Sequence, residues 1–341
     1  MERIAAGLLN IVHRSYDLLF SVGSQISLTS LGCAFVIAAA FLTLRHIRRR
    51  GRMRPRVLLR ALFPRRILLH RSTGADIGWL LFNCFVYGAI FGLAGLSYQF
   101  LTNSVVRGLA SAFGPVTPSA WPEIAQRTTV TVILFFAYEF GYWTDHYLKH
   151  RIPALWEVHK VHHTAEVLTP LTTFRMHPLD TLVFGHVLAM TAALANGVAA
   201  YAFGDTTYQY ALSGTNILLV LFIHAYVHLQ HSHIWIAFRG LLGRVFVSPA
   251  HHQIHHSTNP MHFNKNLGSC LAIFDWMFGT LHIPAKSPER LTYGVEPAIP
   301  DAHTVSGEFL SPFGRFFAVL FGWMRRRPAA APAPVAQASP R

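Results

Sequence analysis

Long apolar runs separated by short polar segments dominate the chain. Runs at 26–44, 77–100, 128–143, 179–203 and 208–231 contain few charged residues. A helix of about 20 apolar residues is long enough to cross the hydrocarbon core of a bilayer, and helices satisfy their own backbone groups there. The pattern predicts an all-α fold, a polytopic membrane helix bundle of about four to five spans.

Positive charge gathers between the first two runs. Eleven arginines lie between Arg45 and Arg71, and the net charge of the chain is +14. Nucleic acid is one partner for such a segment, but the apolar runs favour a membrane protein, in which short cytosolic loops collect arginine and lysine. We therefore expect no nucleic-acid partner, a first span that ends in the cytosol and a second span that leaves it.

The same pattern divides the chain into four parts. Residues 1–76 are expected to hold an N-terminal interfacial segment, the first span and the arginine-rich cytosolic loop. Residues 77–290 form the domain that carries most histidines, and 291–327 form a C-terminal amphipathic segment. The Pro/Ala-rich tail at 328–341 is expected to be disordered.

Histidines recur at helical spacing in this large middle part. Residues that are three or four apart lie on one face of a helix, and imidazole is a common ligand for iron, zinc, copper and nickel. The predicted topology brings all these groups to the cytosolic side, so they predict a metal site there. The candidate ligands are His146, His150, His159, His162, His163, His224, His228, His231, His252, His255 and His256.

The words around these histidines resemble a known family. HYLKHRIPALWEVHKVHH (146–163), SPAHHQIHHS (248–257), Asn266-Leu-Gly and FDWMFGT (274–280) are similar to segments of the fatty acid hydroxylase/sterol desaturase superfamily of membrane di-iron enzymes. The resemblance covers residues 135–282, and makes 77–290 a hydroxylase-like catalytic domain. It implies membrane helices under a cytosolic helical cap that carries a histidine-rich dimetal site.

The resemblance also implies roles for particular residues. His146 and His150 match the first histidine box, His159, His162 and His163 the second, and His252, His255 and His256 the last. The less regular middle box falls on His224 and His228, with His231 next. Side chains expected to orient the ligand rings or line the site are Glu139, where the family often has Asp, Asp145, Glu157, His177, Asp180 and Asn266.

The implied cofactors are two Fe ions, for which Zn can substitute in a purified sample, with O2 as co-substrate. The substrate would be a membrane lipid (fatty acyl, aminolipid, sterol, hopanoid or carotenoid), hydroxylated at a cytosolic active site of a bacterial inner membrane. No flavin, haem or iron–sulfur motif is evident, so electrons would come from a ferredoxin or a cytochrome b5-type protein with its reductase.

Three other functions stay open. A desaturase would use the same di-iron site. A membrane metal-binding or transport protein would place histidines along a path through the bilayer. A bis-histidine haem protein would need pairs facing each other across helices, which leaves both H-x2-H-H boxes unexplained. The sequence leaves open which lipid is used and the oligomeric state.

Overall fold

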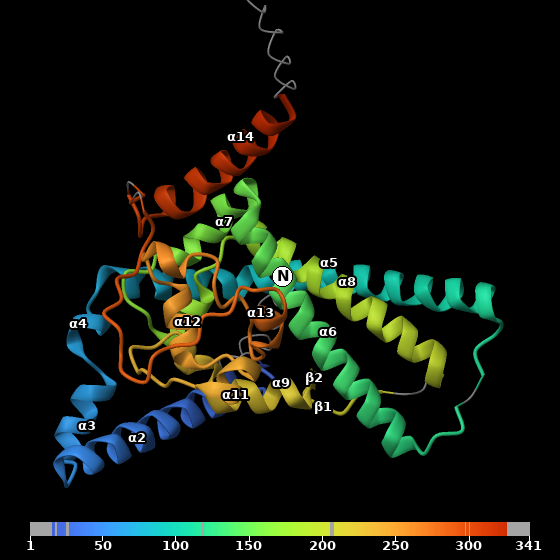
Figure 1. Cartoon of the computed structure of the whole chain (residues 1–341). Coiled ribbons are helices and arrows are strands. Elements are labelled where there is room, and N and C mark those ends of the chain that lie inside the picture. The colour runs from blue at the N-terminus through green and yellow to red at the C-terminus, as the bar shows by residue number, and fades with distance from the viewer. Residues whose placement is uncertain are drawn as a thin grey trace, which may run out of the picture.

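The computed structural model describes residues 16–17, 19–24, 27–117, 119–204, 208–296, 298–299 and 301–325, and within them the chain is mostly helical (Figure 1). The predicted tail at 328–341 and most of the predicted N-terminal interfacial segment fall outside these residues. Among the described residues, four helices are longer than twenty residues: α2 (Leu28–Arg50), α5 (Arg71–Phe113), α6 (Glu123–Arg151) and α8 (Pro178–Phe203).

Short elements connect and cover the long helices. The α-helices among them are α3 (Pro55–Leu62), α4 (Arg65–Leu68), α7 (Pro153–His163), α9 (Ile217–Phe222), α10 (His228–Gln230), α11 (Gly240–Val245), α12 (Pro249–His255), α13 (Ile273–Met277) and α14 (Ser311–Arg325). Single turns of 3-10 helix occupy Pro170–Phe174 and Pro260–His262, and π-helix occupies Ile223–Val227 and Ser306–Leu310.

Two of the described helices, α2 and α8, are long and apolar enough to cross a membrane. The apolar runs predicted at 77–100 and 128–143 lie inside α5 and α6. The helical character of the chain is thus confirmed, while the number of four to five spans stays a prediction.

The fifth apolar run differs from its prediction. A helix was expected from Tyr208, but helix begins only at Ile217, after a two-stranded hairpin, β1 (Ala211–Leu212) and β2 (Thr215–Asn216). Ser213 and Gly214 have φ of 50° and 77°, the left-handed conformation that closes a tight hairpin. The side chain of Asn216 then accepts a hydrogen bond from the Leu218 N–H and so starts the helix.

Helices α5, α6 and α8 pack together beside the remaining short elements (Figure 1). Asn83 of α5 donates to the Met176 carbonyl next to the start of α8, and Val105 lies against Gly197 near its end, so α5 and α8 run in the same direction. Helix α6 runs the opposite way, because Lys149 meets Asp180 while Gly141 meets Thr191. Small residues at these crossings allow the backbones to approach closely.

Pro153 separates α6 from α7 and so bends the chain. Proline is favoured in the first turn of a helix but cannot continue one, and α6 accordingly ends at Arg151. Helix α14 packs against α7, where Arg315 Nε lies 2.8 Å from Glu157 Oε2. The first histidine box, on α6, and the second, on α7, are therefore held at a fixed angle to one another.

A buried ion network ties the C-terminal part to the start of α5. The guanidinium of Arg175 is fully buried and lies 2.7 Å from Asp76 Oδ1 and 3.1 Å from Glu308 Oε1. Trp79 Nε1–H also donates to Glu308. The first turns of α5 thus lie at the same end of the helix bundle as the segment that follows α7.

The α6–α8 crossing is open to a direct test. In Gly141→Ala the new methyl group would collide with the Thr191 hydroxyl, and overpacking of this kind costs about 1–3 kcal/mol. We expect a lower thermal midpoint for the detergent-solubilised protein and its recovery in Gly141→Ala/Thr191→Ala. Gly78→Ala, where a methyl group meets open space, is the control. Equal midpoints for Gly141→Ala and Gly78→Ala would contradict the packing.

Candidate metal centre

Nine histidines from four separate segments converge in two groups. Within each group one ring nitrogen of every histidine lies within 4.8 Å of the corresponding nitrogens of the others. The first group is His146, His150, His159, His163 and His255; the second is His162, His231, His252 and His256. All nine are among the candidate ligands that the spacing predicted.

Each H-x2-H-H box divides its histidines between the two groups. On α7, His159 and His163 belong to the first group and His162 to the second. On α12 the division is reversed, because His255 belongs to the first group while His252 and the adjoining His256 belong to the second. Positions i and i+4 share one face of a helix and i+3 is turned by about 60° from i, so one short helix can serve two neighbouring sites.

The remaining members come from helix ends. His146 and His150 lie on the last turns of α6, and His231 directly follows α10. The two groups adjoin: the ring centroids of His163 and His256 are 4.6 Å apart, and those of His255 and His256 5.3 Å apart. The arrangement is a pair of neighbouring nitrogen clusters.

The first group presents buried nitrogens with no protein partner. The Nε2 atom of each of its five histidines is buried without a hydrogen-bond partner among the described residues. Leaving a buried polar atom unsatisfied costs about 1–3 kcal/mol, so five such atoms aimed at one another call for a shared ligand. A metal cation satisfies all of them at once.

The second group shows the same convergence through short distances. His231 Nε2 lies 3.2 Å from His162 Nε2, 3.1 Å from His256 Nε2 and 2.9 Å from His252 Nε2. Nitrogens bound to one metal at about 2.1 Å are separated by roughly 3.0–3.4 Å in octahedral or tetrahedral geometry. The spacing therefore fits a cation bound between these four atoms.

The donor atoms limit which metal fits. Both groups consist of imidazoles alone. Calcium and magnesium prefer oxygen ligands, whereas imidazole suits iron, zinc, copper and nickel. The residues present thus fit two transition-metal ions of the iron or zinc type.

Backbone carbonyls orient two of the rings. His146 Nδ1–H donates to the Leu267 carbonyl at 2.8 Å, and His255 Nδ1–H donates to the Lys265 carbonyl at 2.9 Å. Between them, Asn266 has φ 58° and donates through its amide to the His251 carbonyl. Asparagine tolerates this left-handed conformation better than most residues, so Asn266 positions both carbonyls and, through them, both rings.

A buried charge chain orients a third ring. The Nδ1–H of His159 donates to Asp180 Oδ1 at 3.3 Å. Lys149 Nζ lies 2.9 Å from the same carboxylate oxygen and 2.6 Å from Asp145 Oδ2, and its side chain is 1% exposed. Lys149 thus compensates two buried carboxylates that would otherwise repel each other.

The other predicted ring-orienting residues make different contacts. Glu139 Oε2 accepts from the N–H groups of Cys270 and Leu271, at 2.9 and 2.8 Å. Glu157 pairs with Lys160 and Arg315. His177 caps α8 by accepting from the Leu179 N–H, and its Nε2 lies 3.1 Å from the Phe309 carbonyl oxygen. These contacts hold the loop after Leu267, α14 and the start of α8 in place.

Two candidate ligands lie outside both groups. The Nδ1–H of His224 donates to the Val220 carbonyl at 2.9 Å, within its own helix. His228 Nε2 lies 3.0 Å from the Ser30 hydroxyl of α2. The structure brings His231 alone, of the three middle histidines, into a group.

Some contacts around the site were missed at the sequence level. Asp275, in the FDWMFGT segment, accepts from the N–H groups of Leu267 and Gly268, and the Thr173 hydroxyl lies 3.0 Å from His231 Nδ1. The i, i+4 spacing of Asp145 and Lys149 signals their ion pair. Spacing gives no signal for the backbone carbonyls, which any residue carries.

Burial favours the neutral form of five of the grouped imidazoles. Loss of solvent, followed by repulsion from neighbouring imidazoles, lowers the pKa of His162, His163, His252 and His256 well below its usual value of 6.5. Burial likewise lowers the pKa of His255 to about 3. Neutral imidazole is the form that binds a metal, so the folded chain holds its rings ready for coordination.

These pKa shifts predict acid sensitivity of the metal-free protein. Unfolded histidines bind protons below about pH 6.5, while the buried ones stay neutral until much lower pH, so protons favour the unfolded state in between. We expect the thermal midpoint of chelator-treated protein to fall as the pH is lowered from 7 towards 5. A midpoint that is constant over this interval would contradict the buried neutral rings.

Lys149 offers a second test. In Lys149→Met the carboxylates of Asp145 and Asp180 lose their shared cation, and breaking a buried ion pair in this way costs about 3–5 kcal/mol. Thermal unfolding should show the loss, with partial recovery in Lys149→Met/Asp145→Asn. Glu123→Gln, which breaks the exposed pair with Arg127, should cost less than about 1 kcal/mol. A similar loss in both single variants would argue against the charge chain.

Comparison with known proteins agrees with this geometry. Residues 131–280 match the family model described as fatty acid hydroxylase, a range that contains all nine grouped histidines. The chain is 27% identical over 222 residues to the ornithine lipid hydroxylase OlsE of Rhizobium tropici, covering 65% of this chain and 60% of that protein. No solved structure matches the chain.

Two further relatives are named for other lipids. An alkylglycerol monooxygenase of Danio rerio is 26% identical over 181 residues, covering 52% of this chain and 35% of that protein. A cholesterol 25-hydroxylase-like protein of the same fish is 25% identical over 236 residues, covering 67% and 84%. The chain thus spans about three fifths of the ornithine lipid hydroxylase and about one third of the alkylglycerol monooxygenase. Residues 131–280 thus match the fatty acid hydroxylase family, and this segment carries the histidine boxes.

Proposed function

We propose that the protein is a membrane-bound lipid hydroxylase that uses two iron ions, O2 and externally supplied electrons. The observation that carries this proposal is the convergence of nine buried histidines in two adjoining groups. Two irons held there would supply the redox chemistry that attacks an unactivated C–H bond, which no ordinary side chain can do.

The chain's own residues hold and shield this centre. The carbonyls of Lys265 and Leu267 and the carboxylate of Asp180 fix the tautomers of three rings, so that each ring presents Nε2. Eight of the nine imidazoles are buried, and His150 is partly buried. Exclusion of bulk water limits side reactions of an oxidising centre.

The overall reaction balances with one external donor. A lipid C–H bond, O2, two electrons and two protons give a C–OH group and one water molecule. A ferredoxin or a cytochrome b5-type protein with its reductase would supply the electrons. The names of the relatives, hydroxylases and monooxygenases, favour hydroxylation over desaturation, which would instead release two water molecules and form a C=C bond.

The charge pattern supports a cytosolic centre in an inner membrane. The arginine-rich segment leads directly into α5, whose first turns bond through Ser72 and Asp76 to Arg175. Basic loops mark the cytosolic side of a membrane. The two histidine groups lie near the N-terminal end of α8, since Asp180 in the first turn of this helix bonds to His159. A closed cluster at one end of α8 also disfavours a transport path through the bilayer.

Metal content of paired variants tests the two-ion centre. His159→Ala/His163→Ala removes an i, i+4 pair from the first group, and His252→Ala/His256→Ala removes one from the second. We expect elemental analysis to find about two ions per chain in the parent and about one in each double variant, because lost ligands weaken binding by at least 10–100-fold. His224→Ala/His228→Ala, an i, i+4 pair outside both groups, should keep both ions.

Loss of metal in His224→Ala/His228→Ala alone, or a folded parent protein that binds no iron, would overturn the two-ion centre. Size-exclusion chromatography of each variant separates loss of ligands from loss of fold.

The product defines the reaction. Lipids of host cells that express the parent or His252→Ala/His256→Ala should be compared by mass spectrometry under isotopically heavy dioxygen. We expect one lipid class to gain a single labelled hydroxyl group only with the parent. An unlabelled product, or a lipid that loses two hydrogens without gaining oxygen, would exclude hydroxylation.

A further inference from the structure

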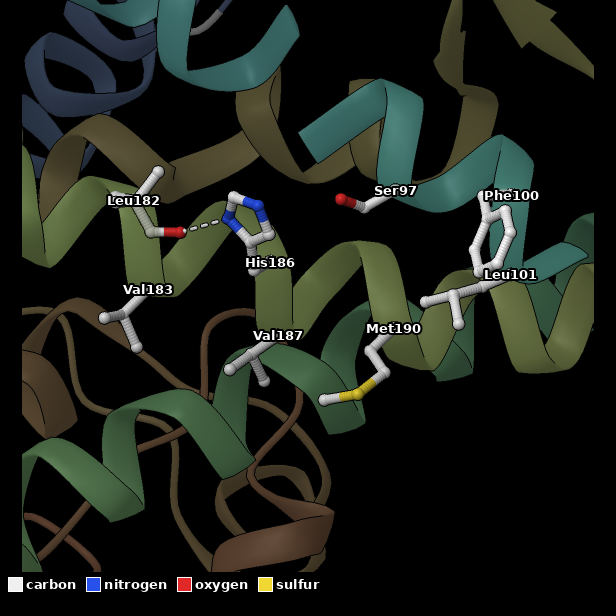
Figure 2. A pocket seen from close by; sticks show the side chains of 8 residues that line it. All are labelled: Ser97, Phe100, Leu101, Leu182, Val183, His186, Val187 and Met190. Carbon is white, nitrogen blue, oxygen red and sulfur yellow. Dashed lines mark hydrogen bonds between the residues drawn. The ribbon is translucent and has the colours of Figure 1, made fainter. Parts of the chain in front are cut away.

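An apolar groove lies between α5 and α8. Its volume is about 550 Å³, and Ser97, Phe100 and Leu101 line it from α5 (Figure 2). Helix α8 lines the other side from Leu182 to Met190, a length of roughly 12 Å at 1.5 Å per residue. The groove therefore follows α8 for two turns from a point close to its N-terminal end.

The groove faces outward from the helix bundle. Phe100 is 66% exposed and Met190 48% exposed, although both are large apolar side chains. Helix α8 is long and apolar enough to cross a membrane, so hydrocarbon rather than water would surround this surface. The occupant that fits this environment is the hydrocarbon chain of a lipid.

Two polar side chains interrupt the apolar lining. Figure 2 shows the His186 imidazole and the Ser97 hydroxyl pointing toward each other across the groove. A histidine within a membrane-spanning helix is costly and is usually retained for function. An unsubstituted hydrocarbon chain has no group that could form a hydrogen bond with either side chain.

Both polar groups offer acceptors to the groove. His186 Nδ1–H donates to the Leu182 carbonyl of its own helix at 2.8 Å, and in this tautomer Nε2 is the acceptor. The Ser97 hydroxyl donates to the Leu93 carbonyl at 3.3 Å, which leaves the lone pairs of Oγ. A ligand that satisfies this pair must bring its own hydrogen-bond donor.

We propose that this groove binds a lipid whose hydrocarbon chain carries a hydroxyl group, which donates to His186 Nε2 beside Ser97 Oγ. The site is separate from the metal centre and goes beyond hydroxylation there. Asp180 and Phe184 turn another face of α8 toward α6, where Lys149 Nζ lies 5.4 Å from the Phe184 ring centroid. A lipid in the groove would lie against the α5 side of the same helix.

The test measures binding, so it needs no turnover. Tritiated octadecanoic acid is bound to the full-length, metal-loaded protein in detergent. It is then displaced by unlabelled octadecanoic acid or by one of three isomeric hydroxyoctadecanoic acids, which carry the hydroxyl group at the second, seventh or twelfth carbon. The carboxylate stays at the polar surface, so the position of the hydroxyl group along the chain sets how deep that group lies in the groove. We expect one isomer to bind about 3–10-fold more tightly than the parent acid, the worth of one net hydrogen bond.

Matched variants assign that preference to the groove. His186→Leu should abolish it and Ser97→Ala should reduce it, with the affinity for octadecanoic acid unchanged, while His224→Leu should preserve it. Val187→Trp should fill the groove and weaken all the acids, whereas Leu194→Trp, on α8 but outside the lining, should not. Equal affinities across the isomers, or a preference unchanged in His186→Leu, would overturn the proposal. Metal content, measured in parallel, keeps this outcome distinct from failure of the hydroxylase assignment.

Discussion

Convergence of buried imidazole nitrogens is the constraint on which the rest of the structure depends. Nitrogens from four segments face one another in water-poor surroundings, and in the first group their Nε2 atoms lack any partner among the described residues. Such an arrangement is unfavourable without cations, because the polar atoms have lost water and gained nothing. Cations bound between these nitrogens would remove this cost, so metal binding would be coupled to folding.

The two H-x2-H-H boxes explain how so few residues build two sites. Each box sends an i, i+4 pair to one group and its i+3 histidine to the other, and the two boxes do so in opposite senses. Helices α7 and α12 thus each connect both groups, while α6 and the segment at His231 each serve one. The bend at Pro153 lets α6 and α7, which are adjacent in sequence, approach the first group from two directions.

Helical faces made most of this site predictable, and spacing failed where contacts are not periodic. Nine of eleven candidate histidines meet, and within a helix the pairs four residues apart lie on one face and enter the same group. His224 and His228 have the same spacing but lie next to α2, and only the three-dimensional path of the chain decides that. The hairpin at 211–216 escaped prediction because the residues that follow it, 217–223, are as apolar as a span, and the Ser213-Gly214 turn alone marks it.

The use of main-chain acceptors at Lys265 and Leu267 has a consequence for how this domain tolerates sequence change. A residue keeps its carbonyl oxygen whatever side chain it carries. Substitutions at these two positions therefore leave the ring orientations of His146 and His255 intact as long as the loop keeps its path. That path depends on Asn266, whose backbone lies in a region open to few residues. Variation among relatives should therefore be permissive at the half-buried Lys265 and restricted at Asn266, while at Leu267 burial of the side chain, and not the hydrogen bond to His146, sets the limit.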